Sequence, residues 1–322
     1  MVDHPIRAVA VRWVRAFTLT IAASAMIGCD GVVDPPEPAP TPPLFDARIA
    51  FTSTRAGSTH IYVASEDGSK VRLLTEGARP AWSPDGKRIA FERASPPTSK
   101  IHIVNVDGTG ERVLTEGVTA SWSPDGASLV FATTVGAQDG GIHVVAADGS
   151  GRKRLVSTEF QNPGRGDWLG WPAWSPDGKT IAFVHTSYDF GWRIFLMNAD
   201  GTSLRPLTPA VPADQTPSWS PDGTMLAFGS FQRIGATTVD GTNSRLFDRA
   251  LAFDPDWSPD GRSLVFNSFS SPVGDVFSSI GSRMRIYILD IATSAVRQLI
   301  PEAERPVLPN YWDKEAVWWR GR

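Results

Sequence analysis

Two groups of side chains in this sequence have the types that catalysis or binding needs. The first is polar: Arg79, Arg93 and His185 offer the cations and the base with which a lyase or lactonase stabilises charge and moves a proton. The second is aromatic and comprises Trp168, Trp171, Tyr188, Trp192, Tyr311 and Trp312. Aromatic side chains on loops suit the binding of a sugar, a peptide or a protein, because they offer a large contact area at little entropic cost.

The common catalytic signatures do not occur in the sequence. It has no G-x-S-x-G nucleophile elbow, no Walker loop and no H-E-x-x-H zinc motif. Its loop carboxylates lack the D-x-D-x-D-G spacing of a calcium site. His102 and His143 take the position that Tyr62 and Phe195 take elsewhere, so we expect them to fill an aromatic packing site. We therefore expect no metal, no cofactor and, on balance, no enzyme activity.

A repeat sets the elements that must position these side chains. The pentapeptide Trp-Ser-Pro-Asp-Gly begins at Trp82 and recurs unchanged at residues 122–126, 174–178, 219–223 and 257–261. A short apolar run follows each copy, and Asp-Gly between two apolar runs indicates a β-hairpin. The five motif aspartates are therefore predicted to form turns. Their repetition argues against catalysis, which needs a unique site.

Each repeat unit reads as four antiparallel strands, which we call A to D. Strand A ends at the motif Trp and strand B is the apolar run. A further Asp-Gly turn, such as Asp67-Gly68, separates strands C and D. Four strands in a period of about 40 to 45 residues are typical of a propeller blade.

The two ends of the repeat region indicate how the ring closes. Residues 46–51 match strand B, and residues 315–319 match strand A. The C-terminal strand is thus predicted to complete the first blade, which removes free sheet edges. The sequence predicts an all-β fold: a six-bladed propeller over residues 44–322, with strand C of the fifth blade reduced to about residues 233–238.

These repeats resemble the WD40-like PD40 repeats of the TolB-type six-bladed propeller. The resemblance covers about residues 44–322 and implies a protein of the bacterial cell envelope. TolB itself carries a globular domain ahead of its propeller. Here only about 15 residues lie between Cys29 and Phe45, so we expect that domain to be absent. The partner contacts of TolB therefore do not carry over as a whole.

The N-terminal residues are predicted to be an export signal and a lipid anchor. Arg7, Arg12 and Arg15 precede a short apolar run, as in a signal peptide over residues 1–28. Residues 26–29, Met-Ile-Gly-Cys, resemble a bacterial lipobox, which makes Cys29 the lipidated residue. The proline-rich stretch that follows predicts an extended tether over residues 29–43. The alternative is an ordinary secretory signal with an incidental cysteine.

Strand direction predicts which face of the propeller binds. Because strands alternate, the A–B and C–D turns share one face, the turn face, and all other connections lie on the opposite loop face. The loop face carries the long segments 157–170, 186–191, 270–282 and 300–314, so we expect it to be the working face. If strand A is innermost, one residue per blade rings the channel mouth there: Arg79, Thr119, Trp171, Thr216, Asp254 and Glu315. Arg93 and His185 stand at the loop-face ends of strand B.

Composition and the missing signatures favour a binding protein. A formal net charge of −3 gives no reason to expect nucleic acid. We expect a monomeric, non-enzymatic scaffold, held on the periplasmic side of the inner or outer membrane by its lipid alone, or secreted if the lipobox is not used. Its loop face would bind an envelope protein or a glycan. The alternatives are a lyase or lactonase with its site at the channel mouth, and a hydrated channel that binds nothing.

Overall fold

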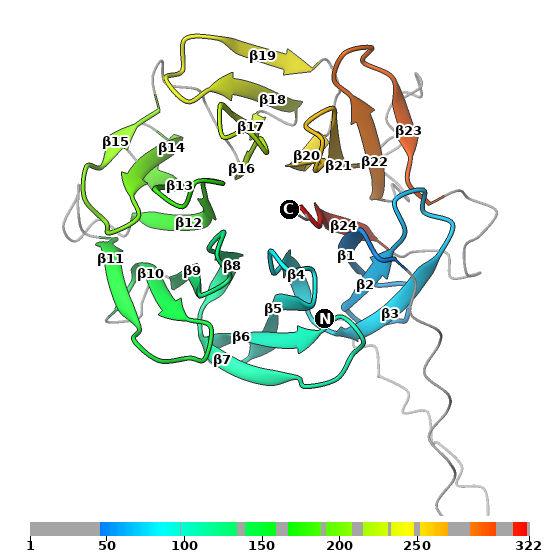
Figure 1. Cartoon of the computed structure of the whole chain (residues 1–322), viewed down its shortest axis with the longest axis horizontal. Helices are drawn as coiled ribbons and strands as arrows, with labels where there is room; N and C mark the ends of the chain where they lie inside the picture. Colours follow the sequence, from blue (N-terminus) through cyan, green and yellow to red (C-terminus); the bar gives the residue numbers. More distant parts are fainter. Residues whose placement is uncertain are drawn as a thin grey trace, which may run out of the picture. The chain divides into compact units, whose positions relative to one another are not determined.

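The computed structural model describes residues 46–96, 98–133, 139–158, 167–187, 191–207, 215–230, 233–247, 252–269, 284–300 and 312–320. Within these residues the chain forms six four-stranded antiparallel sheets, arranged as blades around a central axis (Figure 1). The predicted signal peptide, lipobox and tether lie outside them. No helix in this part of the chain has the length and apolar character that a membrane crossing requires.

The strands of each blade are given from the innermost to the outermost. Blade 1 consists of β24 (Asp313–Trp318), β1 (Ile49–Ser53), β2 (His60–Ala64) and β3 (Val71–Glu76). Blade 2 consists of β4 (Ala78–Trp82), β5 (Arg88–Ser95), β6 (Thr98–Asn105) and β7 (Arg112–Glu116). Blade 3 consists of β8 (Val118–Trp122), β9 (Ser128–Thr133), β10 (Gly141–Ala146) and β11 (Lys153–Ser157).

The other three blades follow the same order. Blade 4 consists of β12 (Trp168–Trp174), β13 (Thr180–Ser187), β14 (Gly191–Asn198) and β15 (Arg205–Pro206). Blade 5 consists of β16 (Gln215–Trp219), β17 (Met225–Ser230), β18 (Arg233–Thr238) and β19 (Ser244–Phe247). Blade 6 consists of β20 (Ala252–Trp257), β21 (Ser263–Ser268), β22 (Arg285–Asp290) and β23 (Val296–Gln298).

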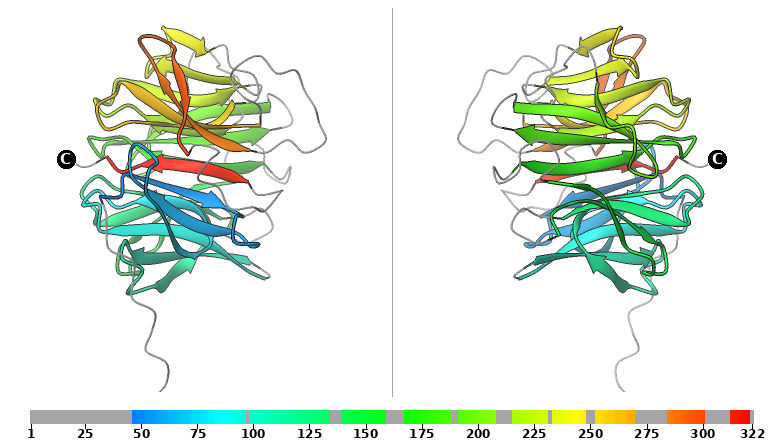
Figure 2. Two further views of the ribbon diagram at one scale, coloured as in Figure 1. Left: turned by 90° about the vertical axis from the view of Figure 1, so that its right-hand side faces the viewer. Right: turned by 90° about the vertical axis from the view of Figure 1, so that its left-hand side faces the viewer.

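The predicted fold class and ring closure are confirmed. The C-terminal strand β24 pairs with β1 in antiparallel register, with Trp318 opposite Ile49 and Lys314 opposite Thr52. Strand A is innermost in every blade (Figure 1). In the edge-on views, β24 runs through the thickness of the disc and ends on the side marked by the C-terminus (Figure 2). This side is the turn face.

The motif aspartates are turn formers, as predicted. Asp85 accepts hydrogen bonds from the Ser83 hydroxyl (2.6 Å) and from the Lys87 backbone N–H (3.1 Å). Gly86 closes the turn by donating to the Ser83 carbonyl, with a φ of 67° that favours glycine. The other four copies repeat this pattern through Asp125, Asp177, Asp222 and Asp260.

The core lies between the blades. Six apolar clusters each join two neighbouring blades, and the motif tryptophans pack into them. The Trp122 indole N–H, for example, donates to the Ala81 carbonyl of the preceding blade at 3.1 Å. The predicted aromatic packing position is also confirmed, since His102 stacks on Phe91 and His143 on Phe131.

Arginines on outer strands add a second set of links between blades. The Arg245 guanidinium donates to the Ile291 carbonyl of the next blade, and Arg297 donates to that of Glu66, both at 3.2 Å. Arg72 and Arg112 bond Val106 and Ala147 in the same manner. These arginines therefore link neighbouring blades at the rim of the ring. From the sequence alone they would be taken for solvent-exposed charges.

Candidate functional site

A bulge in each inner strand aims one side chain at the central axis. The register shifts within strand A of every blade, at residues that include the predicted ring positions. All six ring residues adopt positive φ, from 34° to 55°: Arg79, Thr119, Trp171, Thr216, Asp254 and Glu315. Bulges re-aim side chains, and left-handed backbone costs a residue with a Cβ roughly 1–2 kcal/mol. The repeated strain therefore places these six residues around the channel mouth, as predicted.

The channel is a cavity of 690 Å³, within the size range of small-ligand sites. The six ring residues line its loop-face end. Prolines of the repeated motif line its turn-face end: Pro84, Pro124, Pro176, Pro221 and Pro259. The two ends therefore differ in character. The ring residues supply the polar groups of the loop-face end, whereas the turn-face end combines the motif prolines with Ser218, Asp256 and Arg320.

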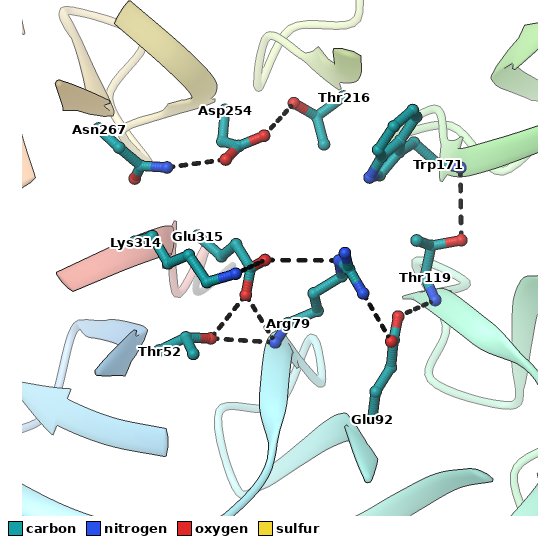
Figure 3. A network of polar contacts seen from close by, with 10 residues as sticks. All are labelled: Thr52, Arg79, Glu92, Thr119, Trp171, Thr216, Asp254, Asn267, Lys314 and Glu315. Carbon is teal, nitrogen blue, oxygen red and sulfur yellow. Dashed lines mark hydrogen bonds and ion pairs between the residues drawn. The ribbon is translucent and has the colours of Figure 1, made fainter. Parts of the chain in front are cut away.

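Arg79 is the centre of a polar network at this mouth (Figure 3). Its guanidinium forms ion pairs with Glu92 at 2.8 Å and with Glu315 at 3.4 Å. Its backbone N–H donates to Glu315 at 3.1 Å and to the Thr52 hydroxyl at 3.0 Å. Lys314 lies 3.1 Å from Glu315. Both cations at this mouth, among the residues described, are thus already paired with carboxylates of the protein.

Glu92 links this network to the next two blades. The residue is 5% exposed, and burial raises its pKa more than the Arg79 guanidinium lowers it. It accepts a hydrogen bond from the Thr119 backbone N–H, and the Thr119 hydroxyl accepts one from the Trp171 backbone N–H at 3.3 Å (Figure 3). The sequence reading missed Glu92, although it follows Phe91 at the position after strand B's repeated apolar run.

Asp254 occupies the opposite side of the mouth. Its carboxylate accepts hydrogen bonds from the Thr216 hydroxyl at 3.1 Å and the Asn267 amide at 2.7 Å (Figure 3). Burial, with a smaller contribution from the Glu315 carboxylate, raises the pKa of Asp254 to about 6. Asp254 therefore changes its charge near pH 6.

Three of the predicted aromatic residues form one cluster on blade 4, which we call the tryptophan triad. The ring centroids of Trp168 and Trp171 are 4.6 Å apart, and Trp192 lies 5.7 Å from Trp168 and 5.8 Å from Trp171. Trp168 and Trp171 are partly buried, whereas Trp192 is 40% exposed. Because β12 and β14 both begin at the loop face, the triad lies there.

Gly170 allows the triad to form. A Cβ on Gly170 would lie 1.9 Å from the nearest ring atom of Trp168, so the indole lies directly against the backbone of β12. Trp171 carries the cluster to the channel, because its side chain lines the cavity and points inward in Figure 3. The triad therefore connects the outer loop face with the channel mouth.

Arg93 and His185, grouped with Arg79 in the enzyme alternative, do not line the cavity. Arg93 points away from the axis and binds Glu111 and the Glu76 carbonyl near the outer strands. His185 is fully buried and bonds Asp167 at 2.8 Å, and burial lowers its pKa more than Asp167 raises it. The grouping at the channel mouth was wrong. Glu92 on β5 reaches Arg79, but the next residue, Arg93, points to the opposite face of the strand, and His185 is enclosed beside Asp167.

Trp312 does not join the triad. Trp312 is 50% exposed and lies in blade 1, across the ring from blade 4 (Figure 1). Its carbonyl accepts a hydrogen bond from the Thr54 backbone N–H, and its own backbone N–H donates to the Thr54 hydroxyl. Tyr188 and Tyr311 lie outside the described residues. Among the residues described, no group of three or more His, Cys, Asp or Glu side chains is arranged to hold a metal ion.

A second polar cluster, which the sequence reading missed, lies toward the turn face. Asp256 accepts hydrogen bonds from the Ser218 hydroxyl at 2.6 Å and the Trp318 N–H at 2.8 Å, and it pairs with Arg320. The available signal was a departure from the repeat, since the residue before the motif Trp is Ala or Ser in the other four copies. This cluster joins three blades at the point where the ring closes.

Comparison with known proteins agrees with this geometry. Residues 40–168 match the family described as PD40, the TolB beta propeller domain. The fold is that of the TolB-type propeller. TolB from Acinetobacter baumannii superposes with a TM-score of 0.65 at 18% identity, over 87% of this chain and 68% of that one. A putative TolB from Agrobacterium tumefaciens gives 0.60 at 19% identity, over 85% and 99%.

The same architecture occurs in an enzyme. Oligogalacturonate lyase from Vibrio parahaemolyticus gives a TM-score of 0.52 at 16% identity, over 80% of this chain and 75% of that one. No curated protein matches the chain by sequence. At such identities the similarity shows the fold alone, so function has to be argued from the site.

Proposed function

We propose that this protein is a non-enzymatic binding protein of the bacterial cell envelope, which takes a protein or glycan partner on its loop face. The observation that carries the proposal is the tryptophan triad. The three indoles pack against one another, and one of them is 40% exposed. They lie next to a cavity with polar groups at its mouth. Rigid, partly exposed tryptophans are frequent binding hot spots, and preorganisation lowers the entropic cost of binding.

Capture of partners from an envelope extract tests this proposal. We expect the Trp168→Ala and Trp192→Ala variants to lose partners that the wild type recovers. The Trp312→Ala variant is the matched control, because it removes an exposed tryptophan on the opposite blade. Equal recovery of every partner by wild type and both triad variants would count against the tryptophan triad as the binding surface.

The proposed anchor has a separate test. In the proposal Cys29 is lipidated after removal of residues 1–28, and the proline-rich tether holds a monomeric propeller on the periplasmic side of a membrane. Similarity to TolB-type propellers supports an envelope location. Replacement Cys29→Ser should abolish fatty-acid labelling and move the protein from the detergent phase to the aqueous phase. Unchanged labelling would refute the anchor and leave the loop-face proposal intact.

The lyase or lactonase alternative has less support from the site. Of its three candidate side chains only Arg79 lines the cavity, and its guanidinium is already bonded to Glu92 and Glu315. A cation held by two carboxylates is poorly placed to stabilise a developing negative charge. Turnover of a polysaccharide by the purified protein, lost in Arg79→Ala, would favour the enzyme.

A further inference from the structure

We propose that the ligand of this loop face is a neutral oligosaccharide, whose terminal residues stack on the tryptophan triad and enter the channel mouth beside Trp171. This inference rests on the proposed function and names its ligand class. The surface involved is Trp168, Trp171 and Trp192 together with the polar groups of the mouth.

The shape and chemistry of the surface carry the first step. Trp192 on β14 and Trp168 on β12 flank Thr186 of β13 in the sheet register, and Trp171 continues the aromatic surface into the cavity wall. A sugar ring has apolar C–H faces and hydroxyls around its edge. The three indole planes are inclined to one another by 33° to 66°, so a C–H face can stack on one indole at a time. The hydroxyls can then reach the rim of hydrogen-bonding groups supplied by Thr119, Thr216 and Asp254.

Backbone strain at Trp171 is the second observation. Its φ is 47°, a conformation that is unfavourable for a bulky side chain. At the equivalent positions blades 3 and 5 carry Thr119 and Thr216, and blades 2, 6 and 1 carry charged residues. Blade 4 alone turns an indole toward the axis, and it does so where Trp168 and Trp192 already meet.

Charge decides between neutral and acidic sugars. An acidic sugar would need a cation to receive its carboxylate. At the mouth, Arg79 is paired with Glu92 and Glu315, and Lys314 is paired with Glu315. Asp254 and Glu315 would in addition repel a carboxylate. The described part of the mouth thus favours hydroxyl groups over anions.

The cavity is too small to take up a large segment of a partner molecule. A cavity of 690 Å³ takes a small-molecule ligand, and Trp168 and Trp192 outside it can support further rings. A protein partner would instead need a broad complementary surface, of which the triad would be only one part. The two ligand classes therefore predict different minimal probes.

Isothermal titration calorimetry of the purified full chain tests the inference. The neutral probes are chitotetraose, maltotetraose and cellotetraose, and trigalacturonate is the acidic probe. We expect at least one neutral probe to bind with a Kd below about 1 mM, and trigalacturonate to bind at least about ten-fold more weakly. Trp171→Thr and Trp192→Ala should each weaken the neutral probe at least about ten-fold, while Trp312→Ala stays within about two-fold.

Trp171→Thr is chosen because threonine already occupies this position in blades 3 and 5, so the fold should be retained. Trp192→Ala removes a side chain that is 40% exposed and so spares the core. The inference is overturned if no neutral probe binds, or if trigalacturonate binds as tightly as the best neutral probe. It is also overturned if both triad variants bind the neutral probe with wild-type affinity. A protein captured through the triad without sugar binding also overturns it but leaves the proposed function standing. If the variants still bind both the sugar and the protein partners as the wild type does, the inference and the proposed function are both overturned.

Discussion

Arg320 forms an ion pair with Asp256 across the closure of the ring: Arg320 follows β24 of blade 1, and Asp256 lies on β20 of blade 6. Asp256 also receives the Trp318 backbone N–H, so one carboxylate holds the last strand through two bonds. The backbone hydrogen bonds of β24 join it to β1, which belongs to the same blade. The carboxylate thus couples the final strand to the blade beside it.

Loss of this link should destabilise the propeller. We expect Arg320→Ala to lower the free energy of unfolding by about 1–2 kcal/mol, and Asp256→Ala by about 2–4 kcal/mol, because the latter leaves a buried N–H and a partly buried guanidinium without their acceptor. Urea unfolding measures both. Asp46→Ala, which breaks an exposed pair with Arg48, is the control and should change little. Equal effects of Asp256→Ala and Asp46→Ala would contradict a role in closure.

Asp254 should make stability depend on pH. Its folded-state pKa of about 6 lies above the ordinary value of 3.8, so the folded protein binds this proton more tightly than the unfolded chain. Its contribution is present at low pH and is lost as the pH rises through about 6. Relative to Asp254→Asn, we expect wild-type unfolding free energy to fall by about 1–3 kcal/mol between pH 4 and pH 7.

Unfolding of wild type and Asp254→Asn at several pH values measures this difference. Carboxylates that do not interact with Asp254 cancel in the comparison, because they titrate alike in both proteins. An amide can keep both bonds, accepting from Asn267 and donating to Thr216, whose hydroxyl can rotate. A constant difference over this range would show that Asp254 has an ordinary pKa in the folded protein.

Gly170→Ala should displace the Trp168 side chain although no tryptophan is replaced. The added methyl group would overlap the Trp168 ring, whereas the backbone at Gly170 has no positive φ to strain. Close indoles couple in the near-ultraviolet, so we expect circular dichroism to change as it does in Trp192→Ala. Binding to the loop face should fall in both variants. A Gly170→Ala spectrum identical to wild type would mean that the indole does not lie against β12.

The motif aspartates should affect stability and leave binding unchanged. Asp177→Ala removes the acceptor for the Ser175 hydroxyl and the Lys179 N–H on the turn face. We expect a loss of about 1–2 kcal/mol in unfolding free energy, as for other capping side chains. Affinity for a loop-face ligand should stay within error of wild type. A large affinity loss with unchanged stability would place a site on the turn face instead.

The repeat in the sequence was sufficient to predict the propeller. Its Asp-Gly turns fixed strand direction, and the unmatched ends at residues 46–51 and 315–319 predicted closure by β24. The ring of six channel residues was also predicted, because equal spacing from each motif Trp implies equivalent places in a symmetric ring. Local turn chemistry and periodicity decide these features, so they can be read from the sequence without the tertiary structure.

Only the tertiary structure decided which side chains meet. Arg93 and His185 are equivalent to each other in the repeat, yet one reaches outward to Glu111 and the other is buried on Asp167, because the neighbouring strands differ. The bond between Asp256 and Arg320 joins residues 64 positions apart. Sequence periodicity orders positions within a blade, whereas contacts between side chains depend on how bulged strands of different blades converge on one axis. That convergence brings Trp168, Trp171 and Trp192 together beside the channel.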